Sequence, residues 1–215
     1  MYHPDFWEQY AYVYRAVEVL SPYRALHEDV RAAIPPNSDL IVDAGCGVAY
    51  AARHYAAHQY IGLERSRAML RARHDAAQCV QSDLCAPWTL RDCCADAVIS
   101  VNVLYALPCA NHMLREAYRV LKTGGTLVIV TPTRETRNYI IAAEALRETH
   151  QRWRTLLALM RITIANLQII RKRHHFPNIP KIIAQLCTIG FSDIRTTCTY
   201  AKQNALIVAT KGDCR

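Results

Sequence analysis

The 215-residue sequence lacks long apolar runs, internal repeats and low-complexity segments. No stretch of about eighteen uncharged apolar residues occurs, so no membrane-spanning helix is expected. The N-terminus, MYHPDFWEQY, is aromatic and acidic, whereas a secretory leader would be basic and then apolar. We therefore expect a cytoplasmic protein, and the length favours one domain over residues 1–215.

Cysteine spacing typical of metal sites is also absent. The nine cysteines include no CxxC pair, and Cys93 and Cys94 are adjacent. These spacings indicate neither a zinc site nor a disulfide scaffold, so we expect reduced thiols and no bound metal.

The net charge of +8 is concentrated in one segment, in which ten Lys or Arg residues oppose three acids between residues 134 and 181. Such a segment either attracts an acidic substrate, nucleic acid or an anionic membrane surface, or is only a solvated helix face. Aromatic residues do not recur among its arginines in the manner of a base-stacking platform. We therefore do not expect nucleic acid as a partner.

Strand-like and helix-like segments alternate through the first 131 residues. Apolar strands are expected at 40–44, 60–64, 79–83, 97–101 and 126–131, with helices at 5–18, 22–33, 49–57, 65–73, near Trp88 and at 110–121. Short apolar strands separated by helices predict an α/β fold, with a parallel sheet covered on both faces.

The alternation ends after residue 131. Residues 134–173 have a long helical pattern, FPNIP interrupts it, and a helix is expected at 181–188. Two strands follow at 192–198 and 205–210, separated by only TYAKQN. Because so short a link forms a hairpin, the last strand is predicted to be antiparallel.

A glycine turn follows the first strand in the stretch LIVDAGCGVAYAAR. Gly45 and Gly47 permit close backbone approach and direct the amides of the next helix towards a ligand, which is typical of a cofactor cradle. A tight structural turn is the alternative. The third glycine of the nicotinamide pattern GxGxxG is replaced by Tyr50, which argues against that cofactor.

Two acids end the next two strands. Glu64 lies seventeen residues after Gly47, where a carboxylate can accept hydrogen bonds from both hydroxyls of a ribose. Asp83 ends the third strand and could accept from an exocyclic amine such as that of adenine. Each acid alone could be a helix N-cap or a charged strand end, but the ordered series favours a cofactor site.

The motifs LIVDAGCGVAY, YIGLERSRAML, CVQSDL, ADAVISVNVLYALP, LREAYRVLKTGGTLVIVTP and GFSDIRTTCTYAKQNALIVAT together resemble the class I S-adenosylmethionine (SAM)-dependent methyltransferases of the small-molecule and quinone-modifying kind. The resemblance extends from about Phe6 to Lys211. It implies a Rossmann-like seven-stranded sheet of order 3-2-1-4-5-7-6, with strand 7 antiparallel and a helical lid inserted after strand 5, at residues 134–180. The N-terminal helices occupy residues 1–36.

The resemblance implies SAM as the cofactor and assigns residues to it. Asp43 and the backbone from Gly45 through Cys46 to Gly47 would face the methionine part, and Glu64 would bind the ribose. The remaining cofactor residues would be Arg65 beside the adenine, Asp83 and Leu84 at its amine and edge, Tyr14 over the carboxylate, and Asn102 after strand 4.

Two positions depart from the family pattern. The usual third glycine is Ala49, a small replacement that weakens the expectation of tight binding. Strand 4 ends in SVNVLYAL, whereas enzymes that methylate DNA bases or protein amides carry an NPPY-type sequence there. The second difference argues against those substrates.

Methyl transfer from a sulfonium is an in-line displacement that depends mainly on placing the acceptor close to the methyl group in a dry pocket. A general base is therefore optional. Tyr105 and His112 are candidates, but each has a stronger structural interpretation, so the catalytic residues stay unassigned.

The acceptor is expected to meet the segment after strand 5. Its apolar stripe would be a lid, a helix packed on the domain or a dimer contact, and it comprises Leu146, Trp153, Leu156, Leu157, Met160, Ile164 and Leu167. Tyr105, Trp153 and Met160 are predicted to face the acceptor. Arg147, Arg154 and Arg161 recur every seven residues, and RKRHH follows at 171–175, so peripheral contact with an anionic surface is possible.

We therefore predict an enzyme that transfers a methyl group from SAM to a small-molecule or lipid-like acceptor, as a monomer or homodimer. A catalytically silent partner protein with the same fold, and a nicotinamide-dependent oxidoreductase, are the alternatives.

Overall fold

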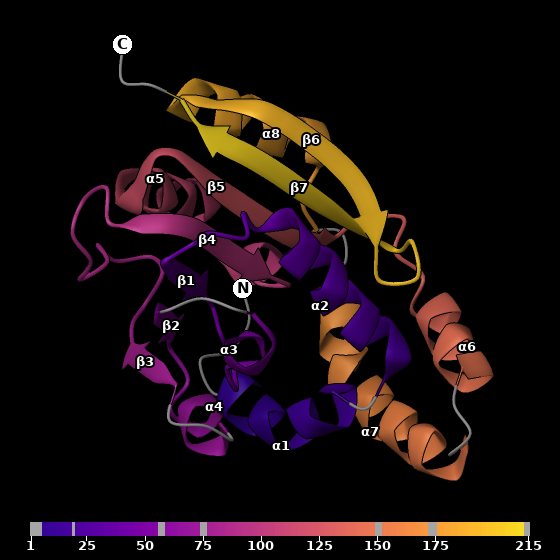
Figure 1. Ribbon diagram of the computed structural model, residues 1–215. Helices are drawn as coiled ribbons and strands as arrows, with labels where there is room; N and C mark the ends of the chain where they lie inside the picture. The colour runs from indigo at the N-terminus through magenta and orange to yellow at the C-terminus, as the bar shows by residue number, and fades with distance from the viewer. Residues whose placement is uncertain are drawn as a thin grey trace.

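Seven strands form one sheet in the order β3-β2-β1-β4-β5-β7-β6 in a computed structural model of the chain (Figure 1). The structure describes residues 6–18, 20–55, 59–73, 77–148, 152–171 and 176–212. The strands are β1 (Leu40–Ala44), β2 (Gln59–Glu64), β3 (Gln78–Gln81), β4 (Ala95–Val101), β5 (Leu121–Pro132), β6 (Phe191–Thr199) and β7 (Asn204–Lys211). The first five are parallel, whereas β7 is antiparallel to both β5 and β6. The predicted order and the antiparallel last strand are confirmed.

Helices lie on both faces of the sheet (Figure 1). They are α1 (Phe6–Glu18), α2 (Ser21–Ala33), α3 (Tyr50–His54), α4 (Arg67–Ala72), the short 3-10 helix η1 (Leu104–Ala106), α5 (Ala110–Val120), α6 (Asn138–Glu148), α7 (Arg152–Arg171) and α8 (Ile179–Ile189). Helices α5 and α8 pack on one face, and α2 and α3 pack on the other.

Residue alternation along the strands builds the two apolar layers. In β5, Leu127 and Ile129 face the α5 and α8 layer, whereas Val128 and Val130 face the α2 layer. All four side chains are buried. Since successive strand side chains point to opposite faces, a continuous apolar run is what a strand buried on both faces requires.

The segment after β5 differs from its prediction. The pattern over residues 134–173 predicts one long helix, but the structure contains two, α6 and α7, separated by residues 149–151, which lie outside the described part of the chain. Residues 172–175 of the RKRHH motif and the side chain of Arg154 also lie outside it. Helix α7 runs beside α1, and α1 also contacts α4 (Figure 1).

The segment between β3 and β4 also differs from its prediction. Strand β3 ends at Gln81, so Asp83 lies in a turn, and turns replace the short helix expected near Trp88. The Arg119 guanidinium of α5 donates to the Trp88 and Leu90 carbonyl oxygens, at 3.0 and 2.8 Å, and to the Asp92 carboxylate. These bonds from one arginine fix the segment in an irregular form.

In the described residues, no helix is long and apolar enough to cross a membrane.

Candidate cofactor and acceptor site

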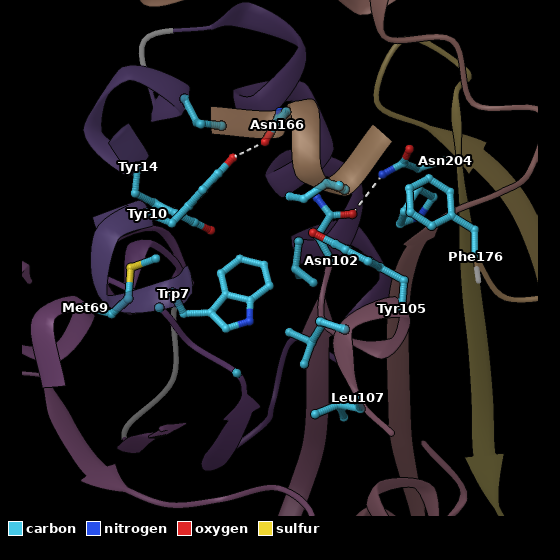
Figure 2. A pocket seen from close by; sticks show the side chains of 18 of the residues that line it. Trp7, Tyr10, Tyr14, Met69, Asn102, Tyr105, Leu107, Asn166, Phe176 and Asn204 are labelled. Carbon is cyan, nitrogen blue, oxygen red and sulfur yellow. Dashed lines mark hydrogen bonds between the residues drawn. The ribbon is translucent and has the colours of Figure 1, made fainter. Parts of the chain in front are cut away.

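One cavity of about 450 Å³ opens at the carboxyl ends of β1, β2 and β4 (Figure 2). This is the edge at which open parallel sheets bind their ligands, and the volume is within the range of small-molecule pockets. The cavity brings together eight of the ten predicted cofactor residues: Tyr14, Gly45, Gly47, Glu64, Arg65, Asp83, Leu84 and Asn102. Predicted Tyr105 lines it as well.

The glycine turn after β1 needs its glycines for two different reasons. Gly45 has a φ of +89°, and a Cβ there would lie 2.4 Å from Val103 Cγ2. Gly47 has a φ of +55° and faces the Tyr14 ring at an ordinary contact distance. Ala49, which stands at the third glycine position of the family pattern, is also left-handed, with a φ of +58°. An alanine tolerates this conformation at a cost of about 1 to 2 kcal/mol.

Glu64 ends β2 and holds the glycine turn. Its carboxylate accepts hydrogen bonds from the Gly47 amide at 3.1 Å and from the Ser66 amide at 2.7 Å. Burial raises the pKa of Glu64, while the backbone hydrogen bonds act in the opposite direction. The carboxylate lines the cavity, where its remaining lone pairs can accept from a ligand.

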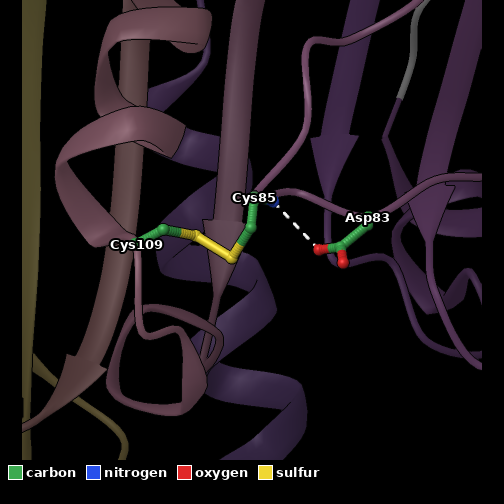
Figure 3. Close-up of a disulfide and its surroundings, with 3 residues drawn as sticks. All are labelled: Asp83, Cys85 and Cys109. Atoms are coloured by element: carbon green, nitrogen blue, oxygen red, sulfur yellow. Dashed lines mark hydrogen bonds between the residues drawn. A yellow bond between two sulfur atoms is a disulfide. The ribbon is translucent and has the colours of Figure 1, made fainter.

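Asp83 and Leu84 occupy the turn after β3. The Asp83 carboxylate accepts from the Cys85 amide at 2.9 Å, and Cys85 forms a disulfide with Cys109 at the start of α5 (Figure 3). The expectation of reduced thiols is therefore wrong for this pair. A sequence separation of 24 carries no spacing signal, and the folding of the β3 and β4 ends brings the two Cα atoms to 5.6 Å.

Asp43 and Cys46 do not line the cavity. Asp43 is buried and accepts a hydrogen bond from the Tyr60 hydroxyl at 2.7 Å. The Cys46 sulfur lies 4.0 Å from the Cys79 sulfur, over Gly62. The Asp43 carboxylate is therefore held within the sheet, while the predicted roles of Asp43 and of the Cys46 backbone towards the cofactor stay predictions.

Asp43 is nevertheless electrostatically unusual. Burial raises its pKa to about 7, with a smaller contribution from the negative charge of Glu64. The hydrogen bond from Tyr60 partly offsets this shift. The carboxyl under the turn therefore gains or loses a proton near neutral pH.

An aromatic wall from α1 closes the cavity opposite the strand ends. Figure 2 shows Trp7 projecting between the helix and the β4 end, with Tyr10 and Tyr14 above it. The Tyr14 hydroxyl lies 2.9 Å from the Tyr23 hydroxyl, and the Tyr10 hydroxyl donates to Asn166 Oδ1 of α7 at 2.7 Å. The second bond joins the N-terminal helix to the segment inserted after β5.

The other end of the cavity is made from chain segments far apart in sequence. Tyr105 of η1 packs edge to face on Phe176, with ring centroids 5.3 Å apart. Asn204, at the start of β7, donates to Asn102 Oδ1 at 2.8 Å (Figure 2). Asn204 is buried, and its own Oδ1 has no hydrogen-bond partner among the described residues. This oxygen is shielded from solvent, so the cavity is lined by other atoms of Asn204.

The predicted acceptor contacts on α7 are wrong. Trp153 and Met160 are 63% and 55% exposed and do not line the cavity. The face of α7 that does line it carries Ile162, Asn166 and Ile169. Helical geometry places these residues opposite the stripe chosen from the sequence.

No general base stands out in the cavity. Burial raises the pKa of Tyr200 to about 12 and the pKa values of Tyr10 and Tyr14 well above their ordinary range, so these phenols stay protonated. His112 does not line the cavity. The described residues contain no cluster of His, Cys, Asp or Glu that could hold a metal ion.

Sequence reasoning missed several residues of the cavity. Trp7 and Tyr10 precede Tyr14 at spacings of three and four residues, so the helical period could have placed them on the same face as Tyr14. Asn166, Phe176, Tyr200 and Asn204 have no local signal, because only the packing of α7 and the C-terminal hairpin on the sheet brings them together.

Comparison with known proteins gives the same family. A family model described as "Methyltransferase domain" matches residues 42–129. Two probable S-adenosylmethionine-dependent methyltransferases of Mycobacterium tuberculosis are each 34% identical over 101 residues, which is 45% of this chain. The chain spans only about a third of the length of these relatives, since the match covers 36% of each.

Solved structures share the fold at lower identity. A possible histamine N-methyltransferase from Thermotoga maritima has a TM-score of 0.67 and 18% identity, over 97% of this chain and all of that one. A putative methyltransferase in complex with the Trm112 methyltransferase activator of Haloferax volcanii has a TM-score of 0.65 and 16% identity, over 96% and 98% of the two chains. The family model identifies a methyltransferase domain over residues 42–129, and the solved structures show that the chain has the fold of class I SAM-dependent methyltransferases.

Proposed function

We propose that this chain transfers a methyl group from SAM to a small or lipid-like acceptor whose enclosed part is uncharged. The observation that supports this most strongly is that one cavity brings the motif residues of a SAM site together with uncharged side chains of α1, η1 and α7. We also propose that residues 1–215 act as one unit, because α1 and α7 close a cavity that begins at the sheet.

The cofactor half of the cavity fits SAM by its chemistry. The glycine turn brings its backbone to the cavity without an intervening side chain, and Glu64 and Asp83 present carboxylates at the end of β2 and in the turn after β3. Carboxylates in these positions suit the hydroxyls of a ribose and the amine of an adenine. Leu84 supplies an apolar edge beside Asp83.

The acceptor half supports an uncharged ligand. Among the described residues that line the cavity, the charged ones are Glu64, Arg65 and Asp83, all at the cofactor end. The remaining lining is apolar or neutral, including Ile162, Phe176 and the side-chain amide of Asn166. Because an unpaired charge would be costly there, we infer an apolar acceptor with a hydrogen-bonding group.

SAM supplies an electrophilic methyl group on a sulfonium. The contribution of this chain is to exclude water and to fix the acceptor. The ring pair Tyr105 and Phe176 forms one wall, and the Tyr10 to Asn166 bond holds α1 against α7. The tyrosines stay protonated and hold the cavity wall through the bonds of Tyr10 to Asn166 and of Tyr14 to Tyr23, and the acceptor releases its proton to bulk solvent when the product leaves.

A transfer assay tests this proposal. The protein is incubated with methyl-tritiated SAM and a panel of neutral phenols, quinols and amines alongside carboxylates and phosphates, and label transfer is counted. We expect transfer to a neutral, largely apolar member. Transfer only to the anionic members, or to none while SAM binds, contradicts the proposed acceptor class.

A further inference from the structure

Helix α7 exposes an apolar face that the cavity does not use. Trp153, Leu156, Leu157, Met160 and Ile164 are between 49% and 68% exposed. Their spacing of three, one, three and four residues places them on one side of the helix. A contiguous apolar surface of this kind on a helix marks an interaction site, since scattered exposed side chains would not align.

The opposite face of α7 is fixed by packing. Thr155, Ala158, Leu159, Ile162 and Ile169 are all buried, and α7 lies against α1. The helix is therefore held with its inner side on the cavity and its outer side presented to the surroundings. The exposed apolar face cannot turn inward without breaking the contacts that close the cavity.

Charge distinguishes the possible occupants of this face. Helix α7 contains four arginines and no acidic residue, and Arg161 is exposed beside the apolar stripe. Residues 134–181 together carry ten basic and three acidic residues. A second copy would bring the same positive charge against itself, whereas an anionic surface would be attracted. An apolar face bordered by arginine is the arrangement of a helix that lies at a lipid interface.

We propose that the exposed face of α7, comprising Trp153, Leu156, Leu157, Met160 and Ile164, docks on an anionic lipid bilayer. The apolar side chains enter the headgroup region and the exposed Arg161 contacts a lipid phosphate. This docking would give the enzyme access to a lipid-like acceptor, and in that respect it rests on the proposed function. It brings α7, one side of which lines the acceptor half of the cavity, to the surface from which a lipid-like acceptor would come.

Vesicle sedimentation tests the docking without SAM. The protein is mixed with phosphatidylcholine vesicles that contain 0% or about 30% phosphatidylglycerol, and the bound fraction is measured. We expect binding to the anionic vesicles at least tenfold stronger than to the neutral ones, and its loss at high salt. Equal binding to both, or no binding, overturns the proposal.

Two matched variants locate the surface. Ile164→Glu should weaken vesicle binding at least tenfold. Val80→Glu introduces the same charge at an apolar residue that is 41% exposed on β3, away from α7, and should leave binding within twofold. Circular dichroism and SAM affinity check that both variants fold. Equal effects of the two variants overturn the assignment to α7.

Trp153 gives an independent signal. Of the three tryptophans, Trp88 is buried and Trp7 lines the cavity. Lipids with brominated acyl chains should quench the emission of the wild-type protein, and Trp153→Phe should remove most of that quenching while binding persists.

The alternatives give different results. If wild-type protein is dimeric by ultracentrifugation, ignores anionic vesicles and becomes monomeric with Ile164→Glu, the face is a homodimer contact and the proposal fails. If vesicles bind but SAM does not, docking stands and the proposed methyl transfer fails.

Discussion

The two ends of the cavity are constructed in different ways. The cofactor end comes mainly from a short part of the chain, residues 45–84, and is made of strand ends, a glycine turn and the three charged side chains of the lining. The acceptor end combines side chains of α1, η1, α7 and β7 and is neutral. Substitutions at the cofactor end should therefore alter SAM affinity through backbone geometry and charge. Substitutions at the acceptor end should alter the KM of the acceptor through packing.

The largest expected effect is at the glycine turn. Gly45→Ala combines left-handed strain with a Cβ only 2.4 Å from Val103, so we expect SAM affinity to fall at least 100-fold. Gly124→Ala is the matched control, because Gly124 has a φ of +77° and no atom within 4 Å of its added Cβ. Calorimetric titration of both variants is the measurement. Retained affinity in Gly45→Ala would show that the turn is not the cradle.

Asp43 should give the cofactor end a characteristic pH dependence. Its pKa is about 7 in the folded state against an ordinary 3.8, so the folded protein keeps the proton over a pH range in which the unfolded chain has lost it. The free energy of unfolding should therefore fall as the pH rises from about 4 to about 7, by up to about 4 kcal/mol.

Asp43→Asn provides the comparison, since the amide stays neutral and can still accept from Tyr60. His27, whose pKa burial lowers to about 3, gives stability the opposite pH trend, which is common to both proteins and cancels in their difference. Urea unfolding without ligand at pH 5 and pH 8 measures that difference. A difference that is the same at both pH values contradicts the account.

The disulfide joins the cofactor end of the cavity to the acceptor end. Cys85 lies two residues after Asp83, and Cys109 directly follows Leu107 and Pro108, which line the cavity after η1. Cys85→Ser should lower the free energy of unfolding by about 3.5 kcal/mol, the chain-entropy value for a separation of 24 residues. Cys187→Ser, at an exposed free cysteine of α8, should have little effect. Thiol titration in denaturant should find two further reactive thiols after reduction, and an unchanged count argues against the bond.

The smallest expected effect separates the two faces of α7. Ile162→Val removes one methylene from the acceptor wall and should raise the KM of a water-soluble acceptor about fivefold, with SAM affinity within threefold. The larger truncation Trp153→Ala, on the outer face, should leave both values unchanged. If Trp153→Ala raised the KM and Ile162→Val did not, the acceptor would contact the face of α7 that carries Trp153, as the sequence predicts.

The same contrast explains what could be predicted. Strand order, the antiparallel last strand and the turn at Gly45 follow from local patterns, namely apolar runs, glycine spacing and a short hairpin link. The direction of the Asp43 and Cys46 side chains does not, since it depends on how the turn leaves β1.

Helix α7 shows why the acceptor end was harder. Its sequence, RWRTLLALMRITIANLQIIR, has apolar residues around most of its circumference, so periodicity offers two stripes of similar strength. Packing against α1 selects the stripe containing Ile162. Asn166 and Asn204 lie in a helix and a strand that are far apart in the sequence. Their place in the same cavity can be recognised only in the folded chain.

The most direct test of the central claim is calorimetric titration of the unmodified protein with SAM and with its demethylated product, S-adenosylhomocysteine. The account predicts one site per chain with micromolar dissociation constants for both ligands, because the glycine turn, Glu64 and Asp83 line a single cavity. Absence of binding by both ligands at millimolar concentration would contradict it.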